Sequence, residues 1–174
     1  DLQKVAYDSL EGKVGSAVAI DTTTGEVLAM VSRPTFDPSR FSTKLTTNYW
    51  NSILQNENRP LRDRNIQEHY APGSTFKIFT ALAALEEKII DEKTTFDCAG
   101  SLMLGRRRFH CWKRGGHGSV NVLRAIKESC DVFFYQVAKK TDIDILAKYA
   151  KDFGVGQRTG ISLPRETTGL MPTK

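Results

Sequence analysis

The segment Ser74-Thr75-Phe76-Lys77 constrains the fold of this chain more than any other, because it stands at an abrupt change in sequence character. It follows Pro72-Gly73, a pair that ends regular structure, and it opens a run of apolar residues with helical spacing. A helix that starts at Ser74 carries Ser74 and Lys77 on one face, three residues apart. The sequence therefore predicts a helix over residues 74–88 with this pair in its first turn.

A serine and a lysine at this spacing can support nucleophilic catalysis. A serine hydroxyl is a poor nucleophile until a base takes its proton, and a lysine one helical turn away can be that base if burial or a second cation lowers its pKa. The alternative is a serine that caps the helix beside a solvated lysine. S-x-x-K also arises by chance, so Ser74 and Lys77 alone leave both interpretations open.

A second serine motif, Ser129-Cys130-Asp131, lies in residues 120–140, which are predicted to form one helix or two helices with a tight join. Distinctive neighbouring segments are Asn65-Ile66-Gln67, Tyr70-Ala71-Pro72-Gly73, Gly116-His117-Gly118 and Thr159-Gly160-Ile161-Ser162-Leu163-Pro164. With these segments the chain resembles the serine transpeptidases of the penicillin-binding protein family, whose motifs are S-x-x-K and S-x-N or S-x-D. From about Ser16 to Lys174 it looks most like the class B elongation enzymes of the penicillin-binding protein 2 type.

The resemblance implies a fold and a reaction. The fold is α+β, of the penicilloyl-serine transferase or β-lactamase-like type, with helices packed on an antiparallel sheet. The reaction is peptidoglycan D,D-transpeptidation, in which Ser74 attacks a stem peptide at its penultimate D-alanine and Lys77 acts as the base. Ser129 relays the proton toward the leaving amine, and Asp131 orients Lys77. The same resemblance implies β-lactam antibiotics as ligands, and an elongation-machinery membrane glycosyltransferase and a scaffold protein as partners.

One family motif, K-T-G or K-S-G, has no counterpart at its expected place. Arg158-Thr159-Gly160 is similar, but it falls in the T-G-I segment of the family, too soon after Ser129. We therefore expect residues 1–174 to be the N-terminal part of a transpeptidase catalytic domain, without its C-terminal strands and with weak or no activity alone. The resemblance places a membrane anchor upstream of Asp1 and the domain on the periplasmic side of the bacterial inner membrane.

The charge of the chain does not indicate a nucleic-acid-binding protein. Its 25 lysines and arginines outnumber its 20 acidic residues, for a net charge of +5. The basic residues are spread along the sequence, and only Arg106-Arg107-Arg108 forms a cluster, interpreted as a solvated loop that could face an anionic polymer. The longest apolar run, Ile78 to Leu85, is too short to cross a bilayer.

The remaining elements follow from local patterns. Residues 16–21 and 26–32 are rich in β-branched side chains and are predicted to pair as a hairpin through Thr22-Thr23-Thr24-Gly25. Residues 97–118 indicate an ordered loop with short strands. Further helices are expected over residues 1–12, 48–54 and 143–153. Strands followed by helices are typical of an α+β domain.

All three cysteines lie near a histidine, in the order Cys98, Cys111, His117 and Cys130. Three thiolates and one imidazole make a full tetrahedral set for structural zinc, so residues 97–130 are predicted to form a zinc-binding loop. Asp97 is a reserve oxygen ligand. Such a site would act as a scaffold, since four protein ligands leave no position for a catalytic water. A disulfide with His117 in a loop hydrogen bond, and buried unpaired thiols, are the alternatives.

Other functions stay open from the sequence. A serine β-lactamase shares the first motif but needs a deacylating base, and no glutamate here can be assigned that role; a β-lactam sensor is disfavoured for similar reasons. A zinc-stabilised binding module without chemistry is the alternative from a different class. Retention of Ser74, Lys77 and Ser129 together argues against it.

Overall fold

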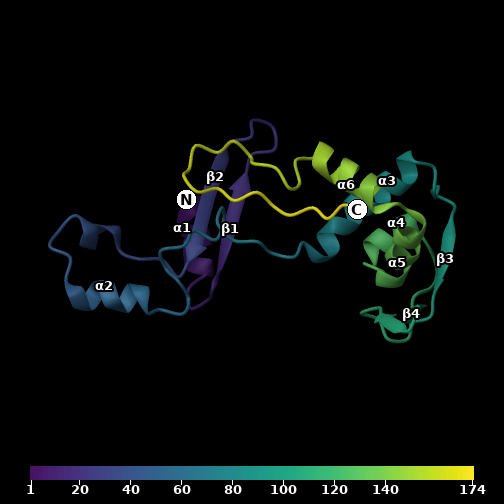
Figure 1. Cartoon of the computed structure of the whole chain (residues 1–174), viewed down its shortest axis with the longest axis horizontal. Coiled ribbons are helices and arrows are strands. Elements are labelled where there is room, and N and C mark those ends of the chain that lie inside the picture. The colour runs from purple at the N-terminus through teal and green to yellow at the C-terminus, as the bar shows by residue number, and fades with distance from the viewer. The chain divides into compact units, whose positions relative to one another are not determined.

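We describe the computed structural model of residues 1–174, in which the chain divides into two units (Figure 1). The first unit contains residues 1–69 and 161–167, and the second contains residues 70–160 and 168–174. None of the helices has both the length and the apolar character that a membrane span requires.

The first unit is built on the predicted hairpin. Strand β1 (Gly15–Ile20) pairs antiparallel with β2 (Val27–Arg33), and helix α1 (Leu2–Ser9) packs against β2. Its further elements are a 3₁₀ turn (Pro38–Phe41) and α2 (Thr47–Leu54). The hairpin turn closes because the carboxylate of Asp21 accepts hydrogen bonds from two backbone N–H groups of the turn.

A side chain from α1 satisfies the outer edge of β2. The amide of Gln3 donates from Nε2 to the Met30 carbonyl (2.9 Å), and its Oε1 accepts from the Met30 N–H (2.8 Å). This pair of bonds reproduces what a neighbouring strand would supply, so α1 is fastened to the hairpin at one defined register.

The second unit contains the remaining elements. Its helices are a 3₁₀ turn (Gly73–Phe76), α3 (Lys77–Glu86), α4 (Val122–Lys127), α5 (Asp131–Lys140) and α6 (Ile143–Asp152). Its strands are β3 (Thr95–Cys98), β4 (Ser101–Leu104), β5 (Arg107–His110) and β6 (Gly118–Asn121). They form two antiparallel pairs, β3 with β6 and β4 with β5.

Helix α5 carries much of the core of this unit. Phe133 and Val137 are fully buried on it, and the Phe133 ring meets that of Phe96 from β3 edge to face, with centroids 5.3 Å apart. Small buried residues of α3, Ala81 and Ala84 among them, leave room for α5 to approach closely. Helix α3, which begins at Lys77, therefore packs against α5, which begins at Asp131.

The structure confirms the predicted α+β class. Two element predictions need correction in detail. The helix expected from residue 74 begins instead as the 3₁₀ turn, and α3 proper starts at Lys77. Residues 120–140 form two helices with a tight join, α4 and α5, which confirms the second of the two predicted alternatives; the start is corrected, because β6 ends at Asn121.

Candidate active site and metal centre

Ser74 lies in a tight turn that presents its side chain to the start of α5 and not to its own helix. Gly73 permits the turn because its φ is +57°, a conformation that L side chains rarely adopt. Neither Pro72 nor Phe76, the two cap positions, makes a side-chain cap bond. The hydroxyl of Ser74 instead accepts a hydrogen bond from Ser129 Oγ at 3.0 Å. The structure therefore does not support the alternative of a capping serine.

Ser129 occupies the break between α4 and α5 in a left-handed conformation, with φ of 51°. Its N–H donates to Ile126 O (3.2 Å), and the next N–H, that of Cys130, donates to Ala125 O (2.9 Å). These two bonds are the pattern of a Schellman C-cap, whose left-handed position is usually glycine. A serine there bears conformational strain, and the strained turn directs its hydroxyl at Ser74 and Lys77.

Lys77 joins the two predicted motifs. Its Nζ donates to Ser129 O at 2.9 Å, to Ser129 Oγ at 3.0 Å and to Asp131 Oδ1 at 2.6 Å. Its side chain is only 14% exposed, which disagrees with the alternative of a solvated lysine. The structure thus brings together all four residues predicted as catalytic: Ser74, Lys77, Ser129 and Asp131.

The carboxylate of Asp131 is held in its charged form. Burial acts to raise the pKa of Asp131, but the hydrogen bond from Lys77, the N–H of Trp112 and the positive charge of Lys77 outweigh burial, so the pKa lies below its usual value. Asp131 Oδ2 accepts the Trp112 N–H at 2.9 Å while Oδ1 accepts from Lys77. Asp131 therefore holds Lys77 Nζ beside the Ser129 hydroxyl.

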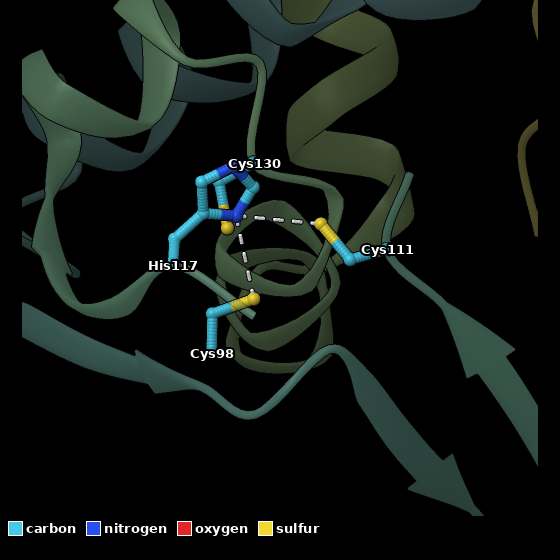
Figure 2. A group of neighbouring side chains, drawn as sticks. All are labelled: Cys98, Cys111, His117 and Cys130. Carbon is cyan, nitrogen blue, oxygen red and sulfur yellow. Dashed lines mark hydrogen bonds between the residues drawn. The ribbon is translucent and has the colours of Figure 1, made fainter. Parts of the chain in front are cut away.

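The four predicted metal ligands also converge. Figure 2 shows the sulfur atoms of the three cysteines gathered around the imidazole of His117, whose Nδ1 is 3.6 Å from Cys98 Sγ and 3.5 Å from Cys111 Sγ. All four ligand atoms lie within 4.8 Å of one another, and all four residues are buried. The three cysteines are free thiols in this structure. Asp97, the reserve ligand, is not part of the cluster.

This donor set fits a tetrahedral zinc ion. Bonds of about 2.3 Å to sulfur and about 2.0 Å to nitrogen separate a sulfur and a nitrogen ligand by roughly 3.5 Å, close to both measured distances. The second nitrogen of His117, Nε2, is buried without a hydrogen bond and lies 3.8 Å from Glu128 Oε2. A carboxylate beside the outer nitrogen is the common arrangement for a metal-binding histidine.

The cysteine thiols differ in how readily they ionise. Burial acts to raise the pKa of Cys111, but backbone N–H groups of Lys113, Val132 and Asp131 outweigh it, and the pKa lies below its usual value. The pKa of Cys130 is raised to about 12, chiefly by burial, with the thiols of Cys98 and Cys111 also acting to raise it against a hydrogen bond from the Phe133 backbone. A cation bound among the sulfur atoms would stabilise the thiolate forms, including that of Cys130, which burial disfavours.

Two glycines allow the backbone to fold around the cluster: Gly100, which was not named from the sequence, and Gly116, which was named only as part of the segment Gly116-His117-Gly118. A Cβ added to Gly100 would lie 2.0 Å from Arg114 O, and one added to Gly116 would lie 2.0 Å from Cys98 O. The approach brings His117 N–H to Cys98 O at 2.9 Å. The sequence signal was available: a glycine stands two residues after Cys98, and another immediately before His117.

The matching family model is the penicillin binding protein transpeptidase domain, which covers residues 15–174. The chain therefore belongs to the penicillin-binding protein transpeptidase family, as the sequence motifs predicted. It is 42% identical over 173 residues to peptidoglycan D,D-transpeptidase MrdA of Acinetobacter baumannii, covering 98% of this chain and 26% of that protein. It is 39% identical over 175 residues to MrdA of Escherichia coli, covering 99% and 28%.

Solved structures agree with this assignment. PBP2 of Pseudomonas aeruginosa superposes with a TM-score of 0.92 at 36% identity, covering 99% of this chain and 38% of that one. PBP2 of Helicobacter pylori superposes with a TM-score of 0.94 at 34% identity, covering 99% and 33%. These likenesses confirm the predicted fold type. The chain spans about a quarter of the length of the curated relatives it matches.

Proposed function

We propose that the protein carrying this chain is a peptidoglycan D,D-transpeptidase of cell-wall elongation. The observation that carries the proposal is the position of Ser129 Oγ, 3.0 Å from Ser74 Oγ and 3.0 Å from Lys77 Nζ. A hydroxyl between a nucleophile and a base can pass a proton in both directions. The names of the relatives favour this function over a β-lactamase, a sensor or a non-catalytic module.

The reaction follows from this chain of contacts. Ser74 Oγ attacks the carbonyl of the penultimate D-alanine of a stem peptide, and its proton moves to Lys77 in its neutral form. The terminal D-alanine leaves with a proton delivered through Ser129, which leaves an acyl group on Ser74. An amine from a second stem peptide then attacks the acyl group, loses its proton along the reverse route and releases Ser74. The product is a cross-link between two stems.

Two further groups complete the proposed site. The N–H of Ser74 supplies one donor to the developing oxyanion, and the second comes from a strand that carries the third family motif, outside residues 1–174. Asp131 stays ionised and positions Lys77 between catalytic steps. β-Lactams are proposed to acylate the same serine.

We propose a structural zinc ion held by Cys98, Cys111, His117 and Cys130. The support is the burial of four convergent donors and their near-tetrahedral spacing. When bound, the ion would cross-link the loop, and because four protein residues coordinate it, no coordination position would be left for a substrate. Cys130 lies between Ser129 and Asp131 in the sequence, so the ion would order both catalytic neighbours.

The setting of the enzyme is proposed from its relatives. A PBP2 of Helicobacter pylori has been solved in complex with MreC, and a neighbour with a TM-score of 0.84 belongs to a peptidoglycan synthase complex that coordinates polymerization and crosslinking. A scaffold protein and a membrane glycosyltransferase are accordingly the proposed partners. Action on stem peptides places the domain on the periplasmic side of the inner membrane, held by an anchor upstream of Asp1.

Mass spectrometry of the intact protein tests this function directly. The longest native form of the protein that contains these residues is incubated with a penicillin, and the adduct is mapped by peptide digestion. We expect one acyl group on Ser74, no adduct on Ser74→Ala, and an undiminished adduct on Ser119→Ala, an exposed serine of β6. An adduct that persists in Ser74→Ala, or none in the unmodified protein, would reject the proposed nucleophile.

A further inference from the structure

Trp112 connects the cysteine and histidine cluster to the turn that carries Ser129. It directly follows Cys111 in sequence, and its indole ring packs edge to face on His117 with centroids 5.5 Å apart. Cys111 and His117 are both buried members of the cluster, whereas Trp112 is 63% exposed. The indole ring therefore lies against His117 at the edge of the cluster, and its Nε1–H bonds outside the cluster.

The side chain and the backbone of Trp112 each donate one hydrogen bond, one on either side of Ser129. The indole Nε1–H donates to Glu128 O at 3.0 Å, one residue before Ser129. The backbone N–H of Trp112 donates to Asp131 Oδ2 at 2.9 Å, two residues after it. Glu128 is the C-cap of α4, where helical carbonyls lack partners within the helix, so the indole satisfies a group that the fold leaves open.

The two Trp112 hydrogen bonds matter because the backbone of Ser129 is strained. A non-glycine residue with φ of 51° persists only where its surroundings over-determine the backbone. Loss of the bond at Glu128 O would let the Glu128–Ser129 peptide rotate toward less strained conformations. Such a rotation would carry Ser129 Oγ away from Ser74 and Lys77, because its two 3.0 Å contacts depend on the turn.

We propose that Trp112 is a positioning residue for the acyl transfer, which transmits the order of the Cys98–Cys111–His117–Cys130 cluster to the Ser129 hydroxyl. This inference rests on the proposed function. Trp112 touches neither Ser74 nor Lys77 through a hydrogen bond; it acts through Glu128 O and through Asp131. The indole N–H is the specific element, since any residue at position 112 except proline retains the backbone bond.

The test uses Trp112→Phe, which keeps an aromatic ring and the backbone N–H but removes the indole donor. Tyr149→Phe is the matched control, because it removes one side-chain hydrogen bond, to Glu87 on the opposite end of α3 from Lys77, and keeps its ring. Acylation by a chromogenic β-lactam is followed in the longest native form, with the acylation rate constant separated from the dissociation constant. Bound zinc is measured on the same samples.

We expect the acylation rate constant of Trp112→Phe to fall roughly 2- to 10-fold, the value of one net hydrogen bond. The dissociation constant and the bound zinc should stay unchanged, and Tyr149→Phe should match the unmodified protein. Hydrogen–deuterium exchange provides a readout independent of activity: the amides of Ser129 and Cys130, which bond to Ile126 O and Ala125 O, should exchange faster in Trp112→Phe alone.

The outcomes separate the two proposals. An unmodified protein that is never acylated rejects the proposed function, and the exchange measurement then decides whether Trp112 orders the turn. Acylation of the unmodified protein with the same rate constant and the same exchange in Trp112→Phe overturns the positioning role. A loss of zinc in Trp112→Phe also overturns it, because the indole would then stabilise the cluster and not Ser129.

Discussion

At Ser129 the requirements of the backbone and of the chemistry oppose each other. The left-handed turn favours glycine, but the proposed reaction needs a hydroxyl at that position. Residue 129 is a serine in a strained left-handed conformation, as expected where activity and stability conflict at a functional site. The cost of the strain can be measured by comparing glycine with alanine there, because both lack the hydroxyl and glycine tolerates positive φ while alanine does not.

We predict that Ser129→Gly is more stable to unfolding than Ser129→Ala by about 1 kcal/mol. Both variants lose the hydroxyl and its bonds to Ser74 and Lys77, so these losses cancel in the comparison. Urea denaturation at neutral pH measures the difference, and β-lactam acylation should be impaired in both. Equal stability of the two variants would show that the turn imposes no strain on residue 129.

Asp91 illustrates a charge that stabilises a local turn. The Thr94 hydroxyl, the Thr94 N–H and the N–H of Lys93 all bond to its carboxylate and hold the pKa of Asp91 below its usual value, despite an opposing effect of desolvation. A depressed pKa in the folded state means that the contribution to stability is complete above the unfolded pKa, near 3.9. It is lost as the pH falls from there through the folded pKa.

We therefore predict that Asp91→Ala destabilises the protein by a constant amount between pH 5 and pH 7, roughly above the unfolded pKa, and that the difference shrinks below about pH 4. Urea midpoints of the variant and the unmodified protein across this range provide the measurement. Glu92→Gln, at the adjacent position, controls for the general effect of removing a negative charge. A difference that is the same at pH 3 and pH 7 contradicts the assignment.

At the scale of elements, the loop around the cluster depends on close backbone approach. Gly116 has φ of +78°, and an added Cβ would lie 2.0 Å from Cys98 O. Gly105, in the β4–β5 turn, has φ of +58° but nothing within 4 Å of the same atom. Both glycines need a positive φ, but only at Gly116 would an added Cβ collide with another backbone segment.

Gly105→Ala is expected to cost about 1 kcal/mol from conformation alone. Gly116→Ala should cost at least about 2 kcal/mol more, because a backbone carbonyl cannot yield without moving β3 away from the cluster. Chemical denaturation gives both values, and zinc titration should show weakened binding only in Gly116→Ala. Similar losses of stability in both variants would mean that the loop adjusts without disturbing β3.

Sequence reasoning succeeded at this scale where local patterns decide the structure. The hairpin, α2 and α6 were predicted close to their observed bounds, and α3 to within three residues at either end, because apolar periodicity and turn residues specify them. The pairing of β3 with β6 was not predicted, since it joins segments some twenty residues apart that are each only four residues long. The break at Ser129 was left open, because serine carries no signal for a left-handed conformation comparable to that of glycine.

The candidate site was predicted more fully than the elements that build it. The resemblance to a known family named Ser74, Lys77, Ser129 and Asp131, the pattern of cysteines and a histidine named the four cluster residues, and the structure brings each set together. Trp112 was missed, because its role depends on a carbonyl that becomes available only when α4 ends at Glu128. Roles of this kind arise from tertiary structure and have no motif.

At the scale of the whole molecule, zinc is expected to stabilise one unit and not the other. The cluster belongs entirely to the unit of residues 70–160, whereas the β1–β2 hairpin belongs to the unit that begins at Asp1. A ligand that binds only the folded state adds about 2.7 kcal/mol of stability at a free concentration one hundred times its Kd.

We predict that a chelator accelerates amide hydrogen exchange in β3, β6, α4 and α5, and leaves β1 and β2 unchanged. Restoring zinc should reverse the effect, and His117→Ala should resemble the chelated protein at all zinc concentrations. Insensitivity to chelator combined with sensitivity to a thiol reductant would favour the disulfide alternative. Insensitivity to both would favour unpaired thiols.

Cys130 belongs to the buried cluster and is covalently joined to Ser129 on one side and to Asp131 on the other. The number of residues between Cys111 and Cys130 is therefore fixed by two anchors at once, and an insertion or deletion there would displace the Ser129 hydroxyl. The β4–β5 turn at Gly105 lies outside that interval and ends in open space. Changes of chain length during evolution should accumulate at this turn and be absent between Trp112 and Ser129.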